Sequence, residues 1–96
     1  MRFEWDPKKA RINVEKHGID FRDATEIFYN NPLVVDTRSG PHGEQRRKAF
    51  GLVAGQWITV VFTRRGAAIR IISARPASRA ERREHRALRP PPRRSR

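Results

Sequence analysis

WITVVFTRRGAAIRIISARPAS, residues 57–78, is the stretch that decides the fold. Two runs rich in β-branched residues, Ile58–Thr63 and Ala68–Ala74, flank a short connection that contains a glycine. Strand-forming runs on both sides of such a turn predict a β-hairpin. Side chains alternate between the two faces of a strand, so in a regular second strand Arg70 and Arg75 point to opposite faces. We therefore expect a structural role for Arg70 and a functional role for Arg75, which stands at the strand end.

Upstream of the hairpin, the sequence predicts two helices and further strands. The Asp6-Pro7 pair is typical of a helix start and Gly18 of the residue after a helix, so a helix should cover residues 7–17. Asp20 is the expected cap of a second helix, which the turn at Asn30-Asn31-Pro32 ends. The other expected elements are strands at residues 2–5, 33–36 and 44–53.

Downstream of the hairpin, Ser78 and Glu81 have the spacing of a capping box, which predicts the start of a last helix at Arg79–Leu88. This helix should lie on the surface, because few of its residues are apolar. The end of the chain, RPPPRRSR, lacks core-forming side chains and predicts a disordered basic tail. The sequence thus predicts one domain at residues 1–88, with helices and a three-stranded antiparallel meander, and a tail at 89–96.

The charge of the chain points to its class of partner. It has 96 residues, with 22 lysines and arginines against ten aspartates and glutamates, and a formal net charge of +12. Such an excess predicts a polyanionic partner, either nucleic acid, an anionic membrane surface or an acidic protein. No apolar run is long enough for a membrane-spanning helix and the N-terminus has no signal-peptide pattern, so we expect a cytoplasmic protein.

Metal and thiol chemistry have little support in the sequence. The chain has no cysteine, so disulfides and thiolate metal sites are excluded. Its three histidines, His17, His42 and His85, lack the spacing of metal ligands relative to one another and to nearby carboxylates. We therefore expect neither a metal nor another cofactor.

Basic residues on or beside strands are the main candidates for binding, because a sheet can hold them convergent. Arg46 and Lys48 share one face of the strand predicted at residues 44–53. An inward-facing cation such as Arg70 requires a bound anion or a carboxylate partner. The carboxylates considered for that partner are Glu44, Glu26 and Glu81. The arginines of the last helix, Arg79 among them, fit a solvated surface equally well.

Arginine and lysine can also carry out chemistry on RNA. When the RNA's own 2′-hydroxyl attacks, catalysis requires mainly that phosphate charge be neutralised in the transition state, which positioned N–H groups can do. Glu44, Lys48 and Arg75 are available for these roles. His17 closes a helix, where an interaction with the last carbonyl groups favours a structural role.

Four blocks of the sequence resemble the BrnT toxins of bacterial toxin–antitoxin pairs. They are FEWDPKKARINVEKHGIDFRDA, EQRRKAFG, ITVVFT and RIISARPASRAERRE, in the family's order, and the similarity covers about residues 2–88. The resemblance implies an α+β, RelE-like microbial ribonuclease fold, with N-terminal helices packed on an antiparallel sheet. A protein of this kind cleaves RNA without a metal and stops translation. The resemblance also implies inhibition by a cognate BrnA-like antitoxin with a ribbon-helix-helix part. Operator DNA would then be bound only through the antitoxin, in a hetero-oligomer.

The family's characteristic positions map onto this sequence in three groups: Trp5, Asp6, Lys16, His17 and Gly18; Arg46, Lys48 and Gly51; and Ile71, Ser73, Arg75, Glu81 and Arg82. From this resemblance we expect Arg75 and Lys48 to bind the scissile phosphate. Glu44 or His17 would be the proton-transfer group.

Arg46, Arg64 and Arg79 are expected to bind the RNA backbone. The chain departs from the family at His85, where many relatives carry a tyrosine. Two alternatives stay open from the sequence alone. One is a non-catalytic basic module that grips RNA or DNA through phosphates, and the other is a basic face that mainly seats an acidic antitoxin.

Overall fold

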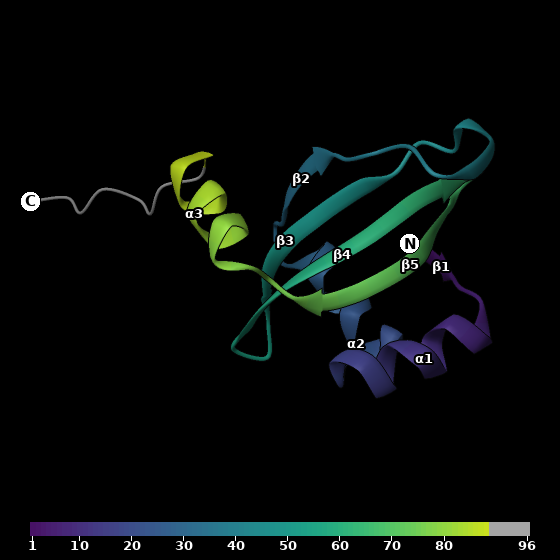
Figure 1. Cartoon of the computed structure of the whole chain (residues 1–96), viewed down its shortest axis with the longest axis horizontal. Helices are drawn as coiled ribbons and strands as arrows, with labels where there is room; N and C mark the ends of the chain where they lie inside the picture. Colours follow the sequence, from purple (N-terminus) through teal and green to yellow (C-terminus); the bar gives the residue numbers. More distant parts are fainter. Residues whose placement is uncertain (89–96) are drawn as a thin grey trace, which may run out of the picture.

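The structure of the chain is a computed structural model that describes residues 1–88 (Figure 1). The predicted tail, residues 89–96, lies outside the described residues. The elements, in chain order, are β1 (Arg2–Glu4), α1 (Pro7–His17), α2 (Phe21–Ala24), a 3-10 helix η1 (Thr25–Tyr29), β2 (Leu33–Asp36), a 3-10 helix η2 (Pro41–Gly43), β3 (Arg47–Val53), β4 (Gln56–Arg65), β5 (Ala68–Pro76) and α3 (Arg79–Leu88). No helix in this described part is long and apolar enough to cross a membrane.

The five strands form one mixed sheet in the order β1-β5-β4-β3-β2. Strands β2 to β5 pair antiparallel, as the predicted hairpin requires, whereas β1 pairs parallel with β5 and places Phe3 beside Ile69. The predicted α+β class is confirmed, but the prediction of a purely antiparallel sheet is wrong. A parallel pair needs a long crossover, and here the two helices and three strands between β1 and β5 supply it.

The helices begin and end where the sequence predicts, with one difference. The side chain of Asp6 accepts a hydrogen bond from the backbone N–H of Lys8 at 2.8 Å, and Gly18 closes α1 with φ +69°. The second helix changes to 3-10 geometry at Thr25. Since residues i and i+3 align in a 3-10 helix, Ala24 and Ile27 both stay buried against the sheet.

The core lies between the sheet and its N-terminal helices. Ile58, Val60 and Phe62 of β4 pack in one apolar cluster with Phe21 and Ile27. Figure 1 shows α1 and α2 together on this side, with α3 set apart at the end of β5.

Asn13 joins α1 to the sheet, since its amide N–H groups donate to the carbonyls of Ile19 and Ala74 at 2.9 and 2.8 Å. Its side-chain oxygen also accepts from the N–H of Ala74 at 3.1 Å.

The other side of the sheet, here called the open face, carries Phe50, Thr59, Val61, Ser73 and Arg75. These residues are cross-strand partners or alternate along one strand, so their side chains share a face. The open face therefore lies opposite α1 and α2, and within residues 1–88 it is α3 that packs at one end of it.

A bulge in β5 changes which arginines share the open face. Val61 is opposite Ser73 but Phe62 is opposite Ile71, so Ile72 is an extra residue in β5. An extra residue reverses the alternation beyond it. Arg70 and Arg75 consequently lie on the same face, opposite Thr63 and Thr59. The opposite-face placement that a regular strand predicts therefore does not apply to β5, because the bulge breaks its regular alternation.

Candidate functional site

The strongest polar arrangement in the described chain is a set of side chains around Glu81, here called the Glu81 cluster: Glu81, Arg75, Lys48 and Thr59. Arg75 donates two hydrogen bonds to the two oxygens of the Glu81 carboxylate, at 2.6 and 2.7 Å. The ammonium of Lys48 donates to Oε2 at 3.3 Å and the hydroxyl of Thr59 to Oε1 at 2.9 Å. Glu81 is only 7% exposed, so both carboxylate oxygens are enclosed by donors.

The local sequence explains how Glu81 reaches this position. The N–H of Glu81 donates to the hydroxyl of Ser78 at 3.1 Å, and the N–H of Ser78 donates to the Glu81 carboxylate at 2.9 Å. The predicted capping box is therefore present. It directs the first turn of α3 onto the sheet. The Glu81 side chain therefore caps the helix and also binds Lys48 of β3 and Arg75 of β5.

The electrostatics of the cluster keep Glu81 and Arg75 charged. Burial opposes the charge of Glu81, but hydrogen bonds from Arg75, the Ser78 amide and Thr59 hold the pKa of this carboxyl well below its usual range. The hydrogen bond to Glu81 raises the pKa of Arg75, against the opposing effect of burial. Two cations and one anion leave the cluster with a net positive charge. The Arg75 and Lys48 side chains are 33% and 24% exposed, so part of each cation faces solvent.

Aromatic rings line the cluster on the open face. The ammonium of Lys48 lies 5.2 Å from the centre of the Phe50 ring, and Phe50 itself is buried. His85, one helical turn after Glu81 on α3, packs its ring against Trp57 with centroids 4.9 Å apart. This position of His85 could not be predicted from the sequence, because the sparse apolar pattern of residues 79–88 indicates only a surface helix.

The middle of the open face is partly exposed. Val61 and Ser73 lie beyond the Glu81 cluster, and past the bulge the guanidinium of Arg70 approaches the carboxylate of Glu4 at 3.9 Å. Arg70 therefore forms the predicted structural ion pair. The prediction of its partner is wrong, because the carboxylate is that of Glu4 and not of Glu44, Glu26 or Glu81. Glu4 belongs to β1, whose parallel pairing with β5 could not be inferred from the strand patterns.

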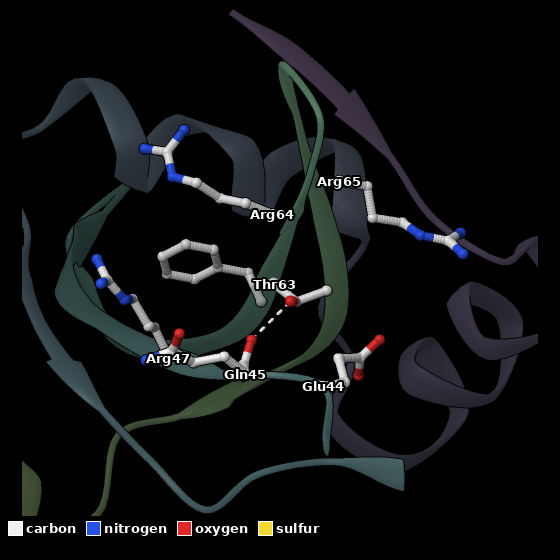
Figure 2. Close-up of a pocket in the computed structure, with 7 residues that line it drawn as sticks. Glu44, Gln45, Arg47, Thr63, Arg64 and Arg65 are labelled. Atoms are coloured by element: carbon white, nitrogen blue, oxygen red, sulfur yellow. Dashed lines mark hydrogen bonds between the residues drawn. The ribbon is translucent and has the colours of Figure 1, made fainter. Parts of the chain in front are cut away.

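At the opposite end of the sheet lies a second basic region, here called the basic end: Arg46, Arg47, Arg64 and Arg65. A hollow of about 410 Å³ opens there between the start of β3 and the end of β4 (Figure 2). Figure 2 shows the Arg47 and Arg64 side chains on one side of the hollow and Arg65 directed the other way. The hydroxyl of Thr63 donates to the carbonyl of Gln45 at 2.6 Å, which closes the floor.

Carboxylates at the basic end balance only part of its charge. Arg46 pairs with Glu44 at 2.9 Å, and Arg47 pairs with the exposed Asp36 at 3.2 Å. Arg64 and Arg65 are exposed. Because β3 begins at Arg47, Glu44 and Arg46 precede the strand that was predicted to contain them.

The structure brings together some of the predicted site residues and separates others. Lys48 and Arg75 meet at Glu81, as their expected joint role requires. His17 is exposed at the end of α1, on the helix-covered side of the sheet, and Glu44 belongs to the basic end. Within residues 1–88, neither of them has a hydrogen bond or ion pair with the Glu81 cluster. Arg79 is exposed in the first turn of α3.

Metal-ligating side chains are dispersed in the described part of the chain. Residues 1–88 contain no group of three or more histidine, aspartate or glutamate side chains placed to hold a metal ion.

Comparison with known proteins identifies the family to which this fold belongs. A family model described as the ribonuclease toxin, BrnT, of type II toxin–antitoxin systems matches residues 5–81. The chain belongs to this family. The resemblance seen in the sequence is therefore confirmed, and a type II toxin has an antitoxin as its partner. The match includes every member of the Glu81 cluster and ends before His85.

A solved structure of the BrnT family has the same fold. The crystal structure of the Brucella abortus ribonuclease toxin, BrnT, is 34% identical in sequence with a TM-score of 0.69, and the similarity covers 82% of this chain and 99% of that one. A search of curated proteins found no match.

Proposed function

We propose that this BrnT-family chain is a metal-independent endoribonuclease that cuts RNA in the cytoplasm, stops translation, and is held inactive by a BrnA-like antitoxin. The Glu81 cluster carries the proposal. One buried carboxylate holds Arg75 and Lys48 at a single point of the open face, with part of each cation turned to solvent. Two cations held together in this way suit a phosphate group of RNA.

Arg75 and Lys48 bind the scissile phosphate in this proposal. They neutralise the charge that develops on its oxygens when the neighbouring 2′-hydroxyl attacks. A guanidinium has five N–H donors and an ammonium three, so the bonds to Glu81 leave donors for the substrate on both side chains. Because Glu81 already orients them, little conformational entropy is lost when the transition state forms.

The basic residues outside the cluster bind the flanking RNA backbone. Arg46 and Arg64 would contact it at the basic end, and Arg79 beside the cluster on α3. Four residues of extended strand separate Thr59 from Thr63, which corresponds to about 13 Å. An RNA that occupies both ends therefore spans more than one nucleotide, and its affinity should depend on salt.

For proton transfer, Glu44 is better placed than His17. The Glu44 carboxylate is at the basic end of the sheet, next to Arg46, whereas His17 is at the end of α1 on the helix-covered side. An RNA bound to Arg75 and Lys48 occupies the open face, so His17 is out of its reach.

An acidic antitoxin is the expected inhibitor. A BrnA-like partner with a ribbon-helix-helix part would cover the cations of the open face and carry the toxin to operator DNA in a hetero-oligomer. Inhibition then follows from competition, because antitoxin carboxylates and RNA phosphates use the same donors.

The proposal is tested with purified chain, a mixed RNA substrate and EDTA. We expect RNA cleavage in EDTA, and a loss of about 10²–10³-fold in rate for Arg75→Ala and for Lys48→Ala, the usual effect of removing one transition-state donor. Lys8→Ala on α1 is the matched control. Binding of RNA without cleavage by folded wild-type protein would instead favour the non-catalytic basic module.

Measuring antitoxin binding with the same variants separates the role of Arg75 and Lys48 in catalysis from their role in inhibition. Arg75→Ala protein that loses cleavage but still binds its antitoxin supports the catalytic role. Loss of both activities, with a normal folding transition, supports a face that mainly seats the antitoxin.

A further inference from the structure

We propose that His85 is the general acid of the cleavage reaction and gives its proton to the leaving 5′-oxygen of the RNA. The inference rests on the ribonuclease function proposed above and adds a catalytic group to it. The resemblance assigns His85 no role, and His85 lies beyond residues 5–81, which match the family model.

The position of His85 is fixed by α3. It follows Glu81 by four residues, so the two side chains lie on the same face of the helix. That face packs on the open face of the sheet, where the His85 ring contacts Trp57 at 4.9 Å between centroids and 67° between planes. Trp57 precedes Thr59 by two residues on β4, and the hydroxyl of Thr59 binds Glu81. His85 is therefore beside the Glu81 cluster and partly buried.

Other titratable groups are poorly suited to give this proton. The Glu81 carboxylate accepts hydrogen bonds from Arg75, Lys48, Thr59 and the Ser78 amide and carries no proton to give. Glu44 is bound to Arg46 at the basic end. His17 lies across the sheet and His42 is exposed in the loop before β3. Histidine is also the side chain that gains and loses a proton most readily near neutral pH.

Charged groups near His85 come from the sheet and from its own helix. Arg75 of β5 and Lys48 of β3 bind Glu81, which lies four residues before His85 on α3. Arg82 belongs to the same helix, and the Trp57 indole of β4, which contacts the His85 ring, is uncharged. A phosphate bound to Arg75 and Lys48 adds negative charge at the same place and favours the imidazolium.

The step balances as follows. The 2′-oxygen bonds to phosphorus and its proton passes to solvent water, the bond from phosphorus to the 5′-oxygen breaks, and the His85 imidazolium protonates that oxygen. The products are a 2′,3′-cyclic phosphate and a free 5′-hydroxyl. The neutral imidazole then takes a proton back from water. Arg75 and Lys48 stabilise the phosphate oxygens throughout.

The test compares two linkages at the site that the wild-type protein cuts. One oligonucleotide carries the natural 5′-oxygen and the other a 5′-bridging sulfur, whose thiolate leaves without a proton. His85→Phe keeps a ring against Trp57 but transfers no proton, and His85→Gln is a second non-acidic variant. His42→Gln is the matched control. Thermal unfolding of each variant reports its folding.

We expect His85→Phe and His85→Gln to cut the natural linkage about 10²–10⁴-fold more slowly, the usual contribution of a general acid, with KM unchanged. Both variants should cut the sulfur linkage at nearly the wild-type rate and lose the fall in kcat at high pH.

Equal slowing on both linkages would mean that His85 only supports packing, and wild-type rates on the natural linkage would mean that it has no role. Either result overturns the role of His85 as general acid. Cleavage of RNA by the wild-type protein in the same experiment would still support the ribonuclease function. A folded wild-type protein that cuts neither RNA overturns both proposals.

Discussion

At one end of the open face, Arg75 and Lys48 share the buried carboxylate of Glu81, while at the opposite end of the sheet Arg64 and Arg65 extend into solvent from its two faces. Both ends are basic, but they hold their cations differently. A buried carboxylate fixes the positions of two cations at an electrostatic cost, which suits a reaction that needs exact placement of charge. Exposed arginines keep their hydration on folding, so they carry no desolvation cost. They provide a positive field, which suits binding of a flexible polyanion.

The largest predicted effect comes from Glu81→Gln. The substitution leaves Arg75 and Lys48 without their common anion, and removing one partner of a buried pair typically costs 3–5 kcal/mol. Because both cations are partly exposed, we expect a loss of about 3 kcal/mol in the free energy of unfolding, measured by urea denaturation. Glu84→Gln, on the exposed side of the same helix, is the control. Equal urea midpoints for the two variants would contradict a stabilising cluster.

The second prediction concerns how the stability difference between the wild-type protein and Glu81→Gln depends on pH. The pKa of Glu81 in the folded chain lies below its ordinary value of 4.5, so between the two values the unfolded chain binds more protons than the folded chain. The stability that the cluster contributes is therefore complete above pH 4.5 and decreases as the pH falls toward the folded value. Urea midpoints of the wild-type protein and of Glu81→Gln should converge in acid. A constant gap down to the acid transition would exclude this carboxylate as its cause.

The basic end should affect RNA binding more than stability. We expect the double variant Arg64→Ala, Arg65→Ala to change the free energy of unfolding by less than about 0.5 kcal/mol, as is usual for exposed sites. RNA affinity should fall, and the slope of log affinity against log salt should decrease by about 0.7 for each lost phosphate contact. Lys8→Ala, Lys9→Ala removes the same charge from α1. If this control lowers the slope equally, net charge rather than position determines binding.

The smallest effect is expected at the Glu44–Arg46 pair. Both side chains are partly exposed, and such ion pairs contribute about 0–1 kcal/mol. Glu44→Gln should therefore leave the urea midpoint nearly unchanged and slightly increase RNA affinity, because Arg46 is freed for a phosphate. A stability loss as large as that of Glu81→Gln would remove the distinction between the two ends. Loss of RNA cleavage with normal folding would instead favour Glu44 as a proton-transfer group.

Local interactions explain why many elements could be predicted from the sequence. Asp6, Gly18, Asp20 and Ser78 each act within a few residues of their own position, through caps and turns that depend on the local backbone. The β-hairpin of residues 57–78 follows in the same way from strand-forming runs on both sides of a turn. These signals, together with the blocks shared with BrnT toxins, identified the fold class and the family.

Contacts between distant segments decided the site. The bulge at Ile72 moved Arg70 onto the face of Arg75, and the parallel pairing of β1 gave Arg70 its partner Glu4. Bulges and strand pairing depend on packing between segments far apart in the sequence, so alternation within one strand does not reveal them.

Residues 57–78 by themselves therefore determined a hairpin, a capped helix after it and an arginine at the strand end. Only the tertiary structure decided that the capping glutamate, Glu81, would bind that arginine and Lys48, because burial and ion pairing depend on what α3 packs against. The same packing placed His85 against Trp57. A capping box is a local motif, whereas the charge environment of its side chain belongs to the whole fold.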